Sequence, residues 1–310
     1  MYLNDIVIFH LQFYTGTLSA PLIYHSFGYG GTYTFGIVSG FISLLYLLFC
    51  VKDVKPKILP KNLENSSAIK RYFITPLKDL IKTLSMKRPE NLRSLVWLQY
   101  LSYGLMWFAL SASGAQDVVY LYLLTEFESF DESKYAYIQA YQSGINAFSF
   151  FIIIPFMSNY LKLHDITIQM ISCMSEVLSS FFYPLVNQEW QLYFVTTIGI
   201  MNACKWSLAR SILSKSVERN ELGKALSGIA IVAAAMPFVT TPAIRELYKA
   251  TIDIFPGCFA LLCGAAMLFA FEINGILYTE KHKLNGELKS NEMDVSTIYS
   301  KGILLMEIGH

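Results

Sequence analysis

Charged side chains are scarce in this 310-residue chain. Asp, Glu, Lys and Arg together make up 15% of the residues, whereas a soluble domain of ordinary composition contains about 25%. Hydrophobic residues account for 54% of the chain, and the mean hydropathy is +0.42. The formal net charge is only +1, so no strong overall field favours a nucleic-acid partner. This composition is not that of a soluble domain and indicates a polytopic membrane protein.

Residues that form metal, disulfide or catalytic sites are also few. The five cysteines lie in or beside apolar segments, and the five histidines are scattered without ligand spacing. We therefore interpret the cysteines as small apolar residues and expect no disulfide framework, no metal site and no cofactor. No Ser/His/Asp-like set and no phosphate-binding glycine loop occurs at suitable spacing, so we do not expect an enzyme.

Apolar runs of about 20 residues, the length that crosses the hydrocarbon layer, occur eight times. We expect these spans at residues 6–24, 33–51, 92–115, 135–157, 166–186, 190–213, 225–247 and 254–277. The sequence thus predicts an all-α membrane protein in four parts. Two helices (1–51) precede a polar loop (52–91), and a six-helix unit (92–278) precedes a polar tail (279–310) that we expect to be disordered.

Lys and Arg are distributed unevenly among the segments between these spans. Nineteen lie on the side that carries residues 52–91, and three lie on the opposite side, Lys134, Arg245 and Lys249. Because cytoplasmic loops carry an excess of Lys and Arg, we expect the 52–91 loop and both ends of the eight-span chain to face the cytoplasm. The acidic segment at residues 126–132 would then face the outside or a lumen.

Short motifs stand at defined places relative to the spans. They are Gly114-Ala-Gln-Asp117, Ala209-Arg-Ser-Ile-Leu-Ser-Lys215, Glu221-Leu-Gly-Lys224, Tyr248-Lys-Ala-Thr251 and Phe255-Pro-Gly257. With these motifs the chain resembles the proton-coupled folate transporter family, solute carrier family 46 of the major facilitator superfamily. The resemblance covers residues 16–277 and aligns them with the last eight of twelve helices, so four further helices would precede Met1.

The resemblance implies a function and a setting. It implies a secondary transporter that works by alternating access and moves a small organic anion, folate-like or related, together with protons. The surroundings would be the lipid bilayer of the plasma membrane or of a lysosomal or endosomal membrane, with no nucleic-acid partner. Ala112 stands where folate-transporting members carry a proton-linked histidine, so organic anions other than folate stay open as substrates.

Two cations lie inside the sixth predicted span, Lys205 and Arg210. They are five residues apart, or roughly 140° around a helix, and so cannot share one face. The resemblance places Arg210 in the substrate pathway, where its guanidinium would bind a carboxylate; snorkelling to the membrane surface is the alternative. Lys205 lies deeper and needs a partner. Glu176 in the neighbouring span is either that partner, in a buried ion pair, or a proton-coupling carboxylate.

Other polar residues lie at membrane depth or at its edge. The resemblance places Gln116 and Asp117 at the outer mouth, where Asp117 would gate the path or relay protons; a solvated helix end is the alternative. Gln139, Gln142 and Asn146 follow one another at intervals of three and four residues and form one polar stripe. That stripe faces either a cavity or another helix.

Other function classes compete with transport. A truncated, non-transporting paralogue would keep the six-helix unit as a membrane scaffold or partner subunit, and would tolerate loss of Arg210. A channel would need a repeated polar pore lining, which the sequence does not show. We therefore expect a secondary transporter, with the non-transporting paralogue as the alternative.

Overall fold

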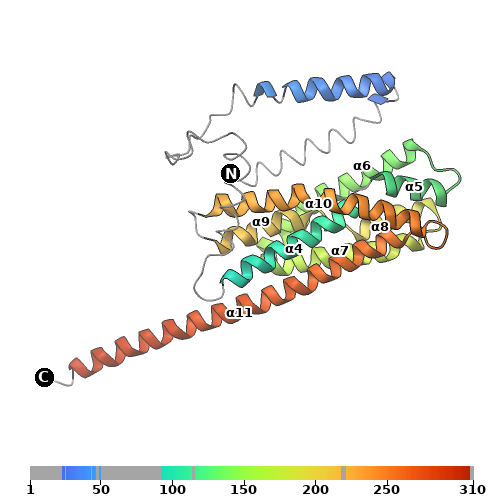
Figure 1. Cartoon of the computed structure of the whole chain (residues 1–310). Helices are drawn as coiled ribbons and strands as arrows, with labels where there is room; N and C mark the ends of the chain where they lie inside the picture. The colour runs from blue at the N-terminus through green and yellow to red at the C-terminus, as the bar shows by residue number, and fades with distance from the viewer. Residues whose placement is uncertain are drawn as a thin grey trace, which may run out of the picture.

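The computed structural model describes residues 23–24, 26–42, 44–46, 49, 92–113, 116–217 and 221–307. Within these ranges the secondary structure is helical and no strand occurs (Figure 1), so the all-α prediction is confirmed. Three helical stretches are long and apolar enough to cross a membrane, namely Glu132–Tyr160, Leu222–Thr251 and Cys258–Lys283. They correspond to the fourth, seventh and eighth predicted spans and indicate a membrane protein.

Eight labelled α-helices make up the described part after residue 91. They are α4 (Leu92–Ser113), α5 (Gln116–Glu126), α6 (Glu132–Phe148), α7 (Asp165–Phe182), α8 (Glu189–Ile198), α9 (Cys204–Ser216), α10 (Leu222–Thr251) and α11 (Cys258–Glu307). Two π-helical turns, Ser149–Ile153 and Phe156–Tyr160, carry α6 onward, and a 3-10 turn, Tyr183–Leu185, ends α7.

The helices form an elongated bundle with its core between α4, α7, α9 and α11. Helix α11 packs along both α4 and α7, while α10 packs against α4 and α9 against α7 (Figure 1). The buried side of α11 follows intervals of three or four residues, at Phe259, Cys263, Met267, Ala270 and Asn274. This is the period of a helix with one face turned to the core, and it fixes which residues of α11 point inward.

The N-terminal part of the chain is described only in pieces. Residues 26–42 are helical, which overlaps the predicted span 33–51, and most of their side chains are exposed. Most of the first predicted span and the whole polar loop 52–91 lie outside the described residues.

The sixth predicted span is wrong in one respect, because it is not continuous. Helix α8 ends at Ile198, residues 199–203 form turns, and α9 begins at Cys204. Two serines of α7 bind the carbonyl groups at the end of α8: Ser175 Oγ donates to Ile198 O at 2.6 Å and Ser179 Oγ donates to Val195 O at 3.1 Å. Since α7 helps satisfy these helix-end carbonyls, the bundle tolerates the break.

The polar tail that we expected to be disordered is helical in the structure as far as Glu307. Helix α11 continues from the bundle to Glu307 and projects well beyond the other helices (Figure 1). Residues 279–307 contain no proline and many Glu, Lys and Leu residues, which favour helix. Lys283 and Glu280 add an ion pair one turn apart, with Nζ and Oε1 separated by 3.6 Å.

Gly257 permits the close approach of the α11 start to the end of α7. A Cβ at this position would lie 2.5 Å from Cβ and 3.1 Å from Cα of Pro184. Because a proline ring cannot swing aside, we predict that Gly257→Ala lowers the free energy of unfolding by about 1–3 kcal/mol, measured on the detergent-purified chain. Gly144→Ala is the matched control, since nothing lies within 4 Å of its added Cβ. Equal effects of the two substitutions would contradict this packing.

Candidate functional site

The most deeply buried charged residues form one ion pair between α7 and α9. The side chain of Lys205 is 0% exposed and that of Glu176 is 5% exposed, and the Lys205 ammonium contacts Glu176 Oε2. Lys205 Nζ also donates a hydrogen bond to Asn202 Oδ1 at 2.5 Å. The ion pair, one of the two alternatives that the sequence left open for Glu176, is therefore present, and Asn202 in the break before α9 supplies the second acceptor.

Local helix geometry brings the two charges together. On α7, Gln169, Cys173 and Glu176 recur at intervals of four and three residues and are all buried, so Glu176 shares the inward face of this helix. On the other side of the contact, Lys205 is the second residue of α9, directly after the broken segment. The sequence predicts both charges at membrane depth, and the rotation of α7 and α9 makes them meet.

Aromatic and sulfur-containing side chains surround the ion pair. The ammonium of Lys205 lies 5.1 Å from the ring centroid of Trp206, a distance at which a cation is attracted to the ring face. The Trp206 ring in turn lies 5.0 Å from Trp107 and 5.7 Å from Tyr103, measured between centroids. The thiols of Cys173 and Cys263 lie within electrostatic range of the ammonium. Helices α4, α7, α9 and α11 all contribute to this environment.

The sequence reasoning missed a second set of polar side chains in the same core. Gln99 Nε2 donates to Ala209 O at 3.4 Å, and Asn274 Nδ2 donates to Ser102 Oγ at 2.9 Å. The amide oxygens of Gln99, Gln169 and Asn274 are buried and have no hydrogen-bond partner within the described part of the chain. Burying an acceptor without a hydrogen-bond partner lowers the free energy of unfolding by about 1–3 kcal/mol. Close packing of the helices therefore gives no reason for these amides. The sequence signal that could have revealed this set is the occurrence of single Gln and Asn residues within otherwise apolar helices.

The remaining predicted site residues are not brought into this cluster. Arg210 is exposed on α9 while Lys205 is fully buried, so the prediction that they occupy different faces is confirmed. Gln142 and Asn146 are half-buried on α6, which packs against α8. Gln116 and Asp117 begin α5, but their side chains lie outside the described residues, and the gate stays a prediction.

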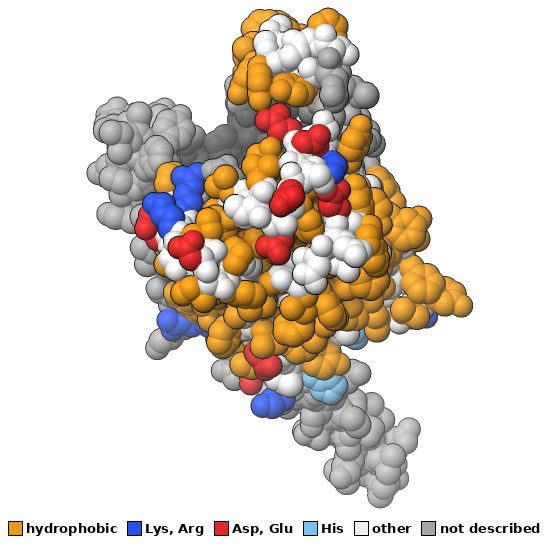
Figure 2. Space-filling view, turned by 90° about the vertical axis from the view of Figure 1, so that its right-hand side faces the viewer, with side chains coloured by type: hydrophobic (Ala, Val, Ile, Leu, Met, Phe, Trp, Pro, Cys, Tyr) orange, Lys and Arg blue, Asp and Glu red, His pale blue; other side chains and the backbone are white. Residues whose placement is uncertain are grey.

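The two ends of the bundle carry opposite charge. The end that holds the 126–132 segment displays acidic side chains among apolar ones (Figure 2). Its described charged residues are Glu126, Glu128, Asp131, Glu132, Glu189, Glu246 and Asp253 with Lys134, Arg245 and Lys249. The opposite end is basic, with Arg93, Lys162, Arg210, Lys215, Lys224, Lys281 and Lys283 against Asp165, Glu221 and Glu280.

Asp165 binds the start of α7 to the end of α9 at the basic end. Its Oδ2 accepts hydrogen bonds from Lys215 Nζ and Ser211 Oγ, each at 2.6 Å. Burial alone would raise the pKa of Asp165, but the bonds from Lys215 and Ser211 outweigh it and hold the pKa below its ordinary value of 3.8. The folded state therefore favours the charged form. The resulting stabilisation is present above the unfolded-state pKa and is lost as the pH falls through the folded-state pKa.

We predict that Asp165→Asn lowers the free energy of unfolding by about 0.5–1 kcal/mol at neutral pH, a small value because Lys215 is 57% exposed and solvent screens the pair. The difference from the unmodified chain should shrink below about pH 4, as followed by thermal unfolding across pH. Asp253→Asn, in the exposed turn after α10, serves as the control and should leave unfolding at neutral pH unchanged. A difference that persisted undiminished in acid would contradict the charge-based account.

No family model matches the chain. The features of the structure that bear on function are the buried Glu176–Lys205 pair and the break in the sixth predicted span. These features lie together inside the helical bundle.

Proposed function

We propose that this chain is a secondary transporter that moves a small organic anion with protons by alternating access, as a member of solute carrier family 46 within the major facilitator superfamily. The observation that carries this proposal is the fully buried Glu176–Lys205 ion pair at a helix break in the bundle core. Transport gives a reason for keeping two charges in the bundle core, where their side chains are only 0% and 5% exposed.

Charge burial of this kind needs a functional reason. Removing a carboxylate and an ammonium from water costs several kcal/mol for each ion, and replacing such pairs by apolar side chains is often neutral or stabilising. Ionisable residues inside membrane helices accordingly mark substrate or ion pathways. Fold stability alone therefore gives little reason for this pair, whereas binding and release of an anion or a proton does.

The broken helix supports the same proposal. Transporters build their binding sites from discontinuous helices, whose ends and unwound backbone face the substrate or the coupling ion. Here the break at residues 199–203 separates α8 from α9 and lies two residues before Lys205. In this proposal, Lys205 attracts the anion, Glu176 carries the proton, and exposed Arg210 serves the mouth of the pathway.

The architecture and orientation follow from the proposed family. Residues 92–278 would form one six-helix half, and the helices before the 52–91 loop would belong to the other half, so that rocking of the halves alternates access. The basic end, with Lys162, Lys215 and Lys224, would face the cytoplasm, and the acidic end would face outward. The Asp117 gate belongs to that outer end.

Uptake into cells that express the full chain tests the proposal. Tritiated folic acid and a panel of labelled small carboxylates should enter faster from acidic than from neutral medium, for at least one compound. Lys205→Met should abolish this uptake, whereas Lys249→Met, at a side chain 70% exposed, should not. Uptake equal to that of untransfected cells, with the chain shown at the membrane, would favour the non-transporting scaffold instead.

A further inference from the structure

The contacts of Lys205 point to a specific binding site. We propose that Lys205 is the site for a carboxylate group of the transported anion, and that Glu176 occupies this site when the anion is absent. This inference rests on the proposed function, which supplies the incoming anion. In a fixed structural pair Glu176 would always occupy Lys205. Here an incoming carboxylate would replace the Glu176 carboxylate at the ammonium.

The structure shows that the site accepts a carboxylate. Lys205 is 0% exposed, and its ammonium contacts Glu176 Oε2 and Asn202 Oδ1. An ammonium has three protons to donate and accepts none, so at this buried position an anionic oxygen is a suitable partner for it. Glu176 is attached to α7, and the same position can be filled by a carboxylate that arrives from outside.

The start of α9 adds to the attraction for an anion. Lys205 lies in the first turn of this 13-residue helix, and Ala203 at the cap offers no side-chain hydrogen bond. The N-terminus of a helix carries partial positive charge. The other titratable groups around the ammonium are the thiols of Cys173 on α7 and Cys263 on α11. With Glu176 moved away, the described surroundings would thus hold one uncompensated cation.

Two buried polar groups on the rings that contact Trp206 have no partner among the described residues. The hydroxyl of Tyr103, whose side chain is 0% exposed, has no hydrogen-bond partner among the described residues, and neither has the buried indole Nε1 of Trp107. Both rings contact Trp206, which contacts the ammonium. Buried polar groups are almost always satisfied, so a ligand that brings a carboxylate and further polar atoms would complete the site.

In this proposal the anion would reach the site past two tryptophans. Trp107 of α4 and Trp206 of α9 are half-buried and, like Ile231 and Val232 of α10, pack against one apolar cluster. Trp206 therefore reaches from the buried ammonium to the partly exposed surface of the bundle. An anion entering between these helices would meet Trp206 before Lys205.

Rescue by a free carboxylate tests the exchange. Glu176→Ala removes the resident carboxylate and leaves room for acetate. For this variant of the full chain, purified in detergent, sodium acetate should raise Tm by about 3 °C relative to sodium chloride at equal ionic strength. The double variant Glu176→Ala/Lys205→Met should show no such shift. Glu189→Ala, which breaks the half-exposed Lys134–Glu189 pair, should show none either. Equal shifts in acetate and chloride would overturn the proposal.

A second variant covers the case in which Glu176→Ala does not fold. Glu176→Gln keeps the side-chain volume and leaves Lys205 without an anion. Because an iodinated ring quenches nearby tryptophan fluorescence, 4-iodobenzoate should bind this variant at least 5-fold more tightly than it binds the unmodified chain, as judged by quenching. Adding Lys205→Met should remove that gain. Unchanged affinity in Glu176→Gln would overturn the proposal.

These binding assays do not depend on transport. The carboxylate site at Lys205 and the transport function can therefore each be contradicted without the other. Acetate rescue without uptake in any cell assay would keep the carboxylate site and overturn the transporter. Uptake without rescue and without tighter binding of 4-iodobenzoate would keep the transporter and reduce the Glu176–Lys205 pair to a fixed structural contact.

Discussion

Lys205→Met is expected to lower the free energy of unfolding of the purified chain by about 3–5 kcal/mol. The substitution keeps an unbranched side chain of similar length but removes the ammonium, which leaves the carboxylate of Glu176 buried without its counter-ion. Breaking a buried pair on one side costs far more than the pair itself contributes, because the remaining charge stays out of water. Chemical denaturation in detergent measures the difference.

The double variant Glu176→Gln/Lys205→Met separates charge from packing. It removes both ions and should recover most of the loss, so that the two single effects are strongly non-additive. Lys249→Met is the control for loss of a lysine as such, because Lys249 is 70% exposed and pairs with Glu246 only at the surface. It should change the free energy of unfolding by no more than about 0.5 kcal/mol. A Lys205→Met effect as small as this control would show that the ion pair is not buried as described.

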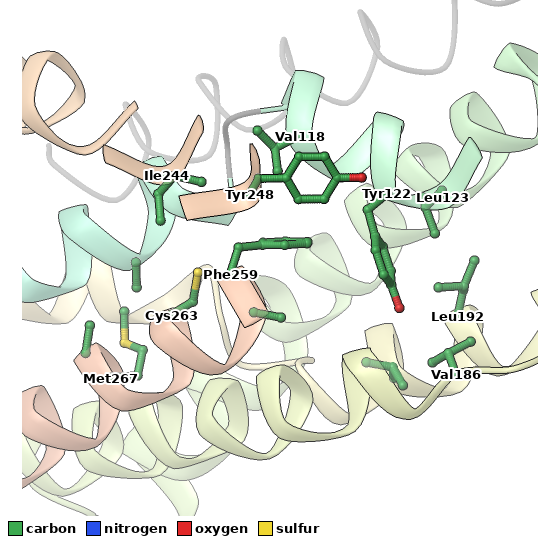
Figure 3. Packing of buried hydrophobic residues seen from close by; sticks show 14 of the residues in the cluster. Val118, Tyr122, Leu123, Val186, Leu192, Ile244, Tyr248, Phe259, Cys263 and Met267 are labelled. Atoms are coloured by element: carbon green, nitrogen blue, oxygen red, sulfur yellow. The ribbon is translucent and has the colours of Figure 1, made fainter. Parts of the chain in front are cut away.

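Phe259→Ala is expected to lower the free energy of unfolding by about 3–5 kcal/mol. Phe259 begins the inward face of α11, is 2% exposed, and lies among the rings of Tyr122 and Tyr248 in the largest apolar cluster (Figure 3). Its centroid is 5.6 Å from that of Tyr122 and 6.2 Å from that of Tyr248. Removing the ring would leave a cavity where α5, α10 and α11 meet.

Phe269→Ala on the same helix is the matched control. Phe269 is 65% exposed, so its loss opens no cavity in the bundle and should change unfolding in detergent by less than about 1 kcal/mol. If the two substitutions destabilised the chain equally, the rotation of α11 about its axis would be wrong. The comparison therefore also tests which face of α11 carries Asn274 and Cys263 into the core.

Much of this arrangement follows from local sequence. Apolar length predicted helices close to α4, α7 and α10 and to the first part of α11, because a membrane-length helix is a property of its own segment. The Glu176–Lys205 pair was also predictable, since a lysine at that depth requires a counter-ion and Glu176 is the carboxylate in the middle of the neighbouring span. The separation of Lys205 from Arg210 followed from helix periodicity alone.

Other features depend on partners far apart in the chain. The break at residues 199–203 was not predictable from Gly199 alone, because hydrogen bonds from Ser175 and Ser179 of α7 help cap the end of α8. Likewise, the Asn274–Ser102 contact joins helices 172 residues apart, and only the packed bundle shows which amide meets which helix.

Solute-driven proton movement in proteoliposomes tests the central claim most directly. The purified full chain would be reconstituted into vesicles that contain a pH-sensitive dye, and folic acid or another labelled carboxylate would be added outside. We expect acidification of the vesicle interior on addition of a transported anion, and none with vesicles that contain Lys205→Met. Acidification that is the same for both proteins, or absent with every anion that enters the vesicles, would contradict proton-coupled transport through this site.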